Sequence, residues 1–337
     1  MIAPVDVVVT WVDDRDAAWR ALRDEHLARS AADPSDVASS DRFRDWDLLR
    51  FWFRGIAAHC PWVGTVHLVT QSPPPDWLDT THPRVRIVRH EDFIPREYLP
   101  TFNSRTIELN LHRIEGLADR FVSFNDDMFV LRPIDQTHFF RGDLPVGFAV
   151  MNALSLGDNV SHAMLNDVHL LNARFAKRKV IRTSPRRWFT PRYGRGVLQN
   201  LALAPWPKFT GFLSHHLPLP MRRATMARVW DEAGTQLERT CRSTFRSFTD
   251  VNVFLFAWWA LCENAFAPAN PRRYGTFIQL DDASIAHACA VIAGARTPIV
   301  CLNDGPLDFE PARARLAAAF AALLPAPCEF ERHQETS

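Results

Sequence analysis

The sequence predicts an α/β protein built on a mostly parallel, doubly wound sheet that is flanked by helices. Short apolar strands alternate with helical segments over the first half of the chain, which is the pattern of such sheets. The first strand, 5–12, is β-branched and almost entirely apolar, as expected when helices cover both faces of a sheet. With 337 residues, 47% of them hydrophobic, the chain can bury a large core.

The individual elements follow from apolar spacing and from the turn residues between them. Further strands are predicted at 63–70, 84–89, 120–124, 277–280 and 298–302. Helices are predicted at 17–29, 46–58, 106–117, 221–233, 251–262, 283–293 and 311–324. We place Pro220 in the first turn of the helix at 221–233, where the missing amide hydrogen costs nothing. Between 151 and 210 the pattern weakens, and we expect a mainly helical, basic insertion.

Composition narrows the class of protein. The 39 basic and 38 acidic residues nearly cancel, so overall charge indicates no nucleic-acid partner. The six cysteines form no CxxC pair or zinc-finger spacing and are expected to be reduced thiols in a cytosolic protein. No signal peptide is recognised, and the longest apolar run, 253–262, is too short to cross a bilayer. We therefore expect a cytoplasmic protein without an integral membrane segment, at most peripheral to the inner face of the membrane.

Polar clusters follow three of the predicted strands. They are Asp13-Asp14, Asn125-Asp126-Asp127 and Asn303-Asp304. Paired carboxylates are costly to hold together unless a cation or an arginine neutralises them, and carboxylate and amide oxygens suit Mg²⁺ or Mn²⁺. Each cluster alone could simply begin a turn. Three clusters at the carboxyl edge of one sheet, where ligands bind in such folds, favour a metal site.

Basic residues and a histidine form two further candidate groups. Arg42 and Arg44 could clasp phosphate oxygens in bidentate pairs, or they could pair with the aspartates beside them. His216 lies just before the start of a predicted helix, with arginines behind it, and suits a phosphate oxygen or a proton transfer. An exposed or capping histidine would give the same pattern, so both interpretations stay open.

The segment before the helix at 106–117 carries Asn103 and Ser104, either of which could cap that helix. Within the helix, Glu108 and His112 are four residues apart and share one face. Capping alone does not account for this group of polar residues.

Four stretches together resemble the conserved regions of the Stealth family. The first is 5–13 (VDVVVTWVD), and the second runs from 42 (RFRDWDLLR) to the FNDD sequence at 124–127. The third contains His216-Leu217-Pro218, the helix after it, Arg246 and Asp250, and the fourth is 300–304 (VCLND). The four stretches occur in family order over most of the chain, so the resemblance is much more specific than a single short motif.

The resemblance implies a bacterial phosphotransferase of capsule or cell-surface polysaccharide synthesis. Such an enzyme moves a hexose-1-phosphate from a UDP-sugar donor onto an acceptor sugar hydroxyl, forms a phosphodiester and releases UMP. It also implies a Rossmann-like or glycosyltransferase-A-like sheet. We expect 1–150 to bind the nucleotide-sugar, 151–210 to form a cap for the acceptor, and 211–337 to complete the catalytic domain.

The matching positions carry the expected roles. His216 is the expected base, and Glu108 is the alternative. Arg44 and Arg246 are expected to neutralise phosphate charge, and Asp127 is expected to take part in catalysis with them. Residues expected to hold Mg²⁺ or Mn²⁺ are Asp126, Asp127 and Asp304. Residues expected to bind substrate are Asp13, Arg42, Asn103, Ser104, Asn125, Asp250 and Asn303.

Two other functions fit parts of the pattern. A metal-dependent glycosyltransferase also uses carboxylates at a sheet edge, but it breaks the sugar C1–O bond and releases UDP. A non-catalytic polysaccharide-binding module would not need the carboxylates, arginines and histidine together. The basic stretch 174–208 either receives a phosphate-bearing acceptor or is an ordinary solvated surface.

Overall fold

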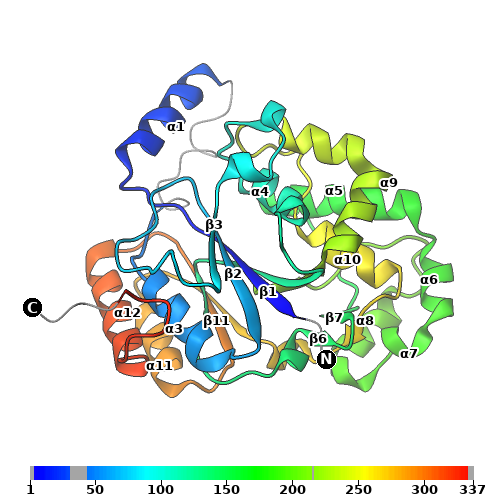
Figure 1. Ribbon diagram of the computed structural model, residues 1–337. Helices are drawn as coiled ribbons and strands as arrows, with labels where there is room; N and C mark the ends of the chain where they lie inside the picture. The colour runs from blue at the N-terminus through cyan, green and yellow to red at the C-terminus, as the bar shows by residue number, and fades with distance from the viewer. Residues whose placement is uncertain (1–3, 31–43, 215, 333–337) are drawn as a thin grey trace, which may run out of the picture.

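A five-stranded sheet forms the centre of the computed structural model, which describes residues 4–30, 44–214 and 216–332. The strand order is β3-β2-β1-β4-β8. The strands are β1 (Val5–Thr10), β2 (Val63–Val69), β3 (Val85–Val88), β4 (Arg120–Asn125) and β8 (Leu219–Arg222). The first four are parallel and β8 is antiparallel to β4 at the edge. The predicted mostly parallel, doubly wound α/β sheet is therefore confirmed (Figure 1).

Alternation along β1 explains why the sheet is covered on both faces. Val5, Val7 and Val9 are fully buried in one hydrophobic cluster, and Val8 is fully buried in a second cluster. Successive side chains of a strand point to opposite faces, so the two clusters lie on the two sides of the sheet. This is the physical reason for the unbroken apolar run seen in the sequence.

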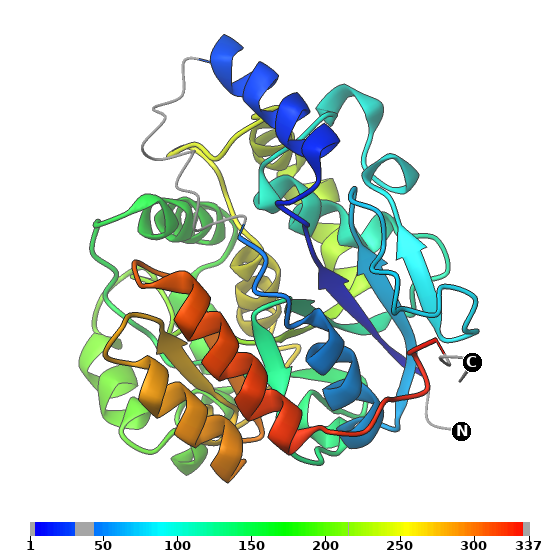
Figure 2. The same cartoon turned by 90° about the vertical axis from the view of Figure 1, so that its left-hand side faces the viewer.

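Two groups of helices supply these clusters (Figures 1 and 2). The first group is α3 (Leu49–His59), α11 (Ile285–Gly294) and α12 (Phe309–Leu323). The second group is α4 (Ser104–Asn110), α5 (Asn159–Arg174), α9 (Arg223–Cys241) and α10 (Phe254–Cys262). Helix α1 (Ala17–Arg29) buries none of its residues and projects from one end of the molecule (Figure 1).

Two smaller sheets lie beside the central one. The first has the order β10-β11-β5, and the second has the order β6-β7-β9. Their strands are β5 (Met128–Val130), β6 (Phe140–Arg141), β7 (Leu144–Gly147), β9 (Ala267–Pro268), β10 (Thr276–Gln279) and β11 (Ile299–Asn303). The prediction that three polar clusters end strands of one sheet was therefore wrong, because β11 belongs to a different sheet from β1 and β4.

The clusters nevertheless converge, because one short turn joins the two sheets. Strand β4 ends in the central sheet at Asn125, Asp126 and Asp127 form the turn, and β5 enters the smaller sheet at Met128. The backbone N–H of Leu302 donates to the carbonyl of Asp127 over 2.9 Å. This bond brings the end of β11 beside the turn.

Two local predictions need correction. Pro220 lies inside the edge strand β8, opposite Val122, and the helix begins only at Arg223. Proline is tolerated on an edge strand because no neighbouring strand needs its amide hydrogen. The helix predicted at 106–117 is divided into α4 and a 3₁₀ turn at Leu111–Arg113.

The stretch 151–210 is helical, as expected. After α5 it forms α6 (Lys177–Thr183), α7 (Pro185–Trp188) and α8 (Gly196–Leu203). Its apolar residues share a hydrophobic cluster with α9 and α10. Across the described ranges, none of the helices has the length and apolar character that crossing a membrane requires.

Candidate active site

A cavity of about 930 Å³ opens at the carboxyl ends of β1, β4 and β11. The residues that line it come from distant parts of the sequence. The central sheet, the sheet β10-β11-β5, α4 and the segment before β8 all contribute. Predicted site residues in its lining are Arg44, Ser104, Glu108, Asn125, Asp126, Asp127, His216, Arg246, Asn303 and Asp304. The cavity is the right order of size for a ligand larger than a single sugar.

His216 faces the turn between β4 and β5. Its Nε2 lies 3.4 Å from Oδ2 of Asp127 and 3.5 Å from the side-chain nitrogen of Asn125. Burial alone would lower the pKa of His216, but the carboxylates of Asp127 and Glu108 outweigh it and raise that pKa. A partly exposed imidazole held against a carboxylate is suited to accept a proton from a bound hydroxyl.

Asp126 and Asp127 concentrate negative charge at the turn. Burial, followed by the adjacent Asp127, raises the pKa of Asp126 well above its usual range. Oδ1 of Asp127 is buried and has no hydrogen-bond partner among the described residues, while its Oδ2 accepts from the Cys301 thiol over 3.3 Å. A cation would relieve both the repulsion and the unpaired oxygen, so these two carboxylates fit Mg²⁺ or Mn²⁺.

The third predicted metal ligand is placed differently. Asp304 receives two hydrogen bonds from Arg44, at 2.9 Å from Nε and 2.6 Å from Nη2, and both side chains are mostly buried. Arg44 also donates to the carbonyl of Gly305 over 3.2 Å. Since the guanidinium already neutralises Asp304, we assign this carboxylate to holding Arg44 at the cavity wall and not to the metal.

A second group of side chains could also be considered as a metal site. Donor atoms of Asp127, His216 and Cys301 lie within 4.8 Å of one another. A buried thiol beside a carboxylate is a poor ligand for Mg²⁺.

Helix α4 brings Glu108 and Ser104 to the cavity wall. Burial raises the pKa of Glu108, and the nearby Arg246 and His216 offset part of that rise. Arg246 donates from Nη2 to the Ser104 hydroxyl over 2.7 Å. The guanidinium is thus held beside Glu108 at the cavity, where it can meet an anionic ligand.

Two predicted substrate contacts are buried outside the cavity lining. Asn103 is 0% exposed, caps α4 and donates to Oδ2 of Asp250 over 3.0 Å. Asp250 is also 0% exposed and accepts a further bond from Arg105 over 3.1 Å. Both residues are enclosed by protein atoms, so we correct their expected role from substrate contact to support of α4.

The remaining predictions fall outside the cavity or outside the described residues. Asp13 lies three residues after β1 and is not part of the lining; its Oδ1 accepts from the backbone N–H and the Nε of Arg15, both over 2.9 Å. Arg42 lies outside the described residues.

Several lining residues were not predicted from the sequence. They include Asp45, Arg105 and Gln279. Gln279 ends β10 at the same edge as Asn303 and accepts from its side-chain nitrogen over 2.7 Å, so a strand-end search including amides would have found it. Burial raises the pKa of Asp45, and no spacing rule separates this residue from the exposed aspartates around it.

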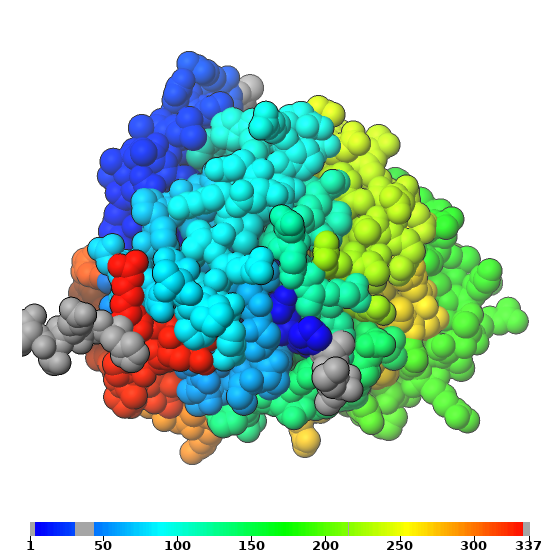
Figure 3. Space-filling model, viewed as in Figure 1, coloured from blue at the N-terminus to red at the C-terminus, as the bar shows by residue number. Residues whose placement is uncertain are grey.

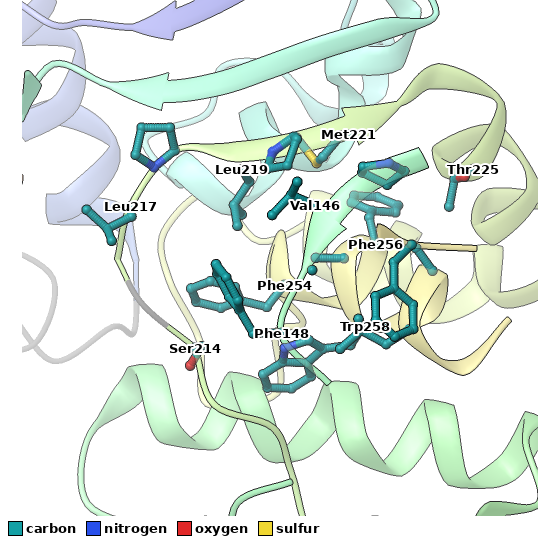
Figure 4. Close-up of a pocket in the computed structure, with 18 of the residues that line it drawn as sticks. Val146, Phe148, Ser214, Leu217, Leu219, Met221, Thr225, Phe254, Phe256 and Trp258 are labelled. Carbon is teal, nitrogen blue, oxygen red and sulfur yellow. The ribbon is translucent and has the colours of Figure 1, made fainter. Parts of the chain in front are cut away.

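A smaller apolar cavity of about 60 Å³ adjoins the first between β7, β8 and α10 (Figure 4). Phe148, Leu219, Phe254 and Trp258 are among the side chains that surround it. Ser214 and Leu217 are among the residues that border both cavities. Among the described residues its lining contains no carboxylate or histidine, so we assign the chemistry to the larger cavity.

Comparison with known proteins identifies the family. Residues 42–145 match the model described as Stealth protein CR2, conserved region 2. The chain is 33% identical to the receptor polysaccharide phosphotransferase WefC of Streptococcus oralis, covering 97% of this chain and 99% of that protein. The chain belongs to the Stealth family of capsular polysaccharide phosphotransferases. It is therefore a transferase, as the sequence predicted.

Other members of the Stealth family match over similar lengths. Identity is 30% to the capsular polysaccharide phosphotransferase WcwK of Streptococcus pneumoniae, covering 97% of this chain and 98% of that one. The chain is 33% identical to the exopolysaccharide phosphotransferase cps2G of Lactiplantibacillus plantarum, and the match covers 97% of this chain and 96% of that protein. Among solved structures, the galactosyltransferase LgtC with donor and acceptor sugar analogs matches at a TM-score of 0.40 and 10% identity, covering 96% of this chain and 98% of that one. Similarity that low supports no conclusion about function.

Proposed function

We propose that this Stealth protein transfers a hexose-1-phosphate from a UDP-sugar to a hydroxyl of an acceptor sugar in bacterial cell-surface polysaccharide synthesis. The observation that carries the proposal is the convergence of Arg44, Glu108, Asp127, His216 and Arg246 on one cavity of about 930 Å³. Two guanidinium groups and two carboxylates around one imidazole suit a pyrophosphate, a cation and a reacting hydroxyl.

In the proposed reaction, the acceptor oxygen attacks the β-phosphorus of the donor. A new O–P bond forms, the bond from that phosphorus to the bridging oxygen breaks, and UMP leaves with the bridging oxygen. The sugar C1–O bond stays intact. His216 takes the hydroxyl proton, and Asp127, 3.4 Å from its Nε2, stabilises the resulting imidazolium. Glu108 is the alternative base.

The arginines act on the phosphate charge. Arg44 is fixed by Asp304 and Arg246 by Ser104, so neither guanidinium needs to reorganise as charge moves to the leaving oxygen. Asp126 and Asp127 would hold Mg²⁺ or Mn²⁺, and when bound the ion would neutralise charge on the phosphate oxygens.

The test is product analysis with Mg²⁺, a panel of UDP-sugars and short acceptor sugars. We expect acceptor-dependent release of UMP. Release of UDP would instead show glycosyl transfer, and retained polysaccharide binding without turnover of any donor would show a binding module.

Single variants then test the assigned roles. We expect His216→Ala to lower kcat roughly 10²–10⁴-fold, and Arg44→Ala roughly 10²–10³-fold. The exposed His169 supplies the control, because His169→Ala should leave kcat unchanged. Full turnover by His216→Ala at saturating donor would transfer the role of base to Glu108.

A further inference from the structure

The stretch from the last turns of α5 to the residues after α8 has an unusual charge composition. Residues 168–210 contain ten lysines and arginines and no aspartate or glutamate. The exposed basic side chains of this segment are Arg174, Arg178, Lys179, Arg182, Arg186, Arg192, Arg195 and Lys208. Arg174 pairs with Glu232, whereas the other seven have no acidic partner within 4.0 Å among the residues described. A nearly neutral protein therefore carries a strongly positive surface at one end.

Large apolar side chains are exposed on the same segment. Leu198 is 68% exposed, and Leu201 and Trp206 are each 54% exposed. Leu198 and Leu201 are three residues apart on α8 and share its outer face, with Arg195 one turn before them. Leucine and tryptophan beside arginine and lysine are the side chains that bind at the interface of a membrane.

The structure holds these apolar side chains outward. On the inner face of α8, the fully buried Asn200 donates to the carbonyls of Ala149 and Trp188 over 2.7 and 2.6 Å. Its side-chain oxygen accepts from the backbone of Met151 over 2.6 Å. These bonds fix the rotation of α8, so Leu198 and Leu201 cannot turn into the core.

A buried lysine joins the apolar part of this surface to the basic part. Nζ of Lys177, at the start of α6, donates to the carbonyls of Leu203 and Trp206 over 2.6 and 3.1 Å. The end of α8 and the exposed Trp206 therefore lie directly beside α6, which presents Arg178 and Lys179 to solvent. Figure 3 shows side chains of this part of the chain, in green, projecting from the right-hand end of the molecule.

We propose that the surface formed by Arg178, Lys179, Arg182, Arg195, Leu198, Leu201 and Trp206 docks the protein on an anionic lipid bilayer. The apolar side chains enter the headgroup region, and the basic side chains meet the lipid phosphates. The docking surface lies at the far end of α5 from the cavity, whose wall includes Asp158 and Val160. Met164 is the last residue of α5 that lines the cavity, and ten residues of helix, about 15 Å, separate it from the end of α5 at Arg174. The active site therefore stays clear of the membrane.

Vesicle flotation with the full chain tests the proposal. We expect binding to phosphatidylcholine vesicles that contain phosphatidylglycerol, weaker binding in 0.5 M salt, and little binding to pure phosphatidylcholine. The variant Arg178→Gln/Lys179→Gln/Arg182→Gln should lower the partition coefficient on the order of 100-fold, at about fivefold for each charge. The variant Leu198→Ser/Leu201→Ser/Trp206→Ser should lower it at least tenfold without lowering the melting temperature.

A matched control removes three positive charges elsewhere. Arg20, Arg296 and Arg315 are exposed on or beside α1, α11 and α12, away from the docking surface, so replacing all three with glutamine should leave vesicle binding unchanged. Equal loss in this control, or wild-type binding to neutral and anionic vesicles alike, would overturn the proposal. So would absence of vesicle binding together with salt-sensitive binding of a soluble anionic polysaccharide, which would make the surface an acceptor site.

Discussion

Replacing Asp250 with asparagine should destabilise the protein while leaving donor binding unchanged. Oδ2 of this fully buried carboxylate accepts from Asn103, Arg105 and the backbone of Ser247, at 3.0, 3.1 and 2.9 Å. An amide oxygen can accept the same three bonds. The charge, however, is lost, and Arg105, only 4% exposed, keeps its own charge.

The magnitude follows from the fate of Arg105. Removing one partner of a buried ion pair typically costs about 3–5 kcal/mol. Arg105 also donates to the carbonyls of Ser247 and Asn159, at 3.1 and 3.0 Å, which compensate in part. We therefore expect Asp250→Asn to lower the free energy of unfolding by about 3 kcal/mol, at the lower end of that range.

The assay is urea unfolding followed by tryptophan fluorescence, together with KM for the donor at a temperature where the variant is folded. Asp119→Asn is a suitable control, because Asp119 pairs with Arg222 at 2.7 Å with side chains 42% and 35% exposed. Such a pair contributes less than about 1 kcal/mol. If Asp250→Asn kept wild-type stability but raised KM tenfold, Asp250 would contact the substrate and our correction would be wrong.

Three further predictions concern stability. Nε2 of His138 donates to the carbonyl of Tyr274 over 3.0 Å, and burial lowers the pKa of His138 to about 4. The contribution of the neutral ring to the free energy of unfolding is complete above pH 6.5, and it decreases by up to about 3 kcal/mol as the pH falls from 6.5 towards 4. The variant His138→Gln should therefore flatten this part of a plot of melting temperature against pH. An unchanged slope would contradict the prediction. Gly55→Ala should cost about 1–3 kcal/mol in urea unfolding, because a Cβ there would lie 2.8 Å from the carbonyl oxygen of Val130. Lys177→Met leaves two carbonyls without their donor and should lower the free energy of unfolding by about 1–3 kcal/mol, whereas wild-type stability would show that water replaces the ammonium group.

The parallel sheet could be predicted because its signal is local. The apolar run of β1 and the alternation of strands with helices depend on residues close together in sequence. The edge strand β8 was missed because Pro220 is favourable both in the first turn of a helix and on an unpaired strand edge. Only the position beside β4 decides between these two environments.

The candidate site could be predicted only in part, for a related reason. Family motifs singled out Asp127, His216 and Asp304, which the structure places around one cavity. The same motifs contain Asn103 and Asp250, which are equally polar but fully buried. Sequence cannot separate a carboxylate that meets substrate from one that neutralises a buried arginine, because the difference lies in which side chains fold over it.

The turn at Asp126 and Asp127 is the covalent connection from β4 in one sheet to β5 in another. Any sliding of the two sheets against each other would shift both carboxylates relative to His216, which precedes β8 in the central sheet, or relative to Asp304, which follows β11 in the smaller sheet. Lengthening this connection by one residue should therefore separate the two acids from His216 or from the pair of Arg44 and Asp304.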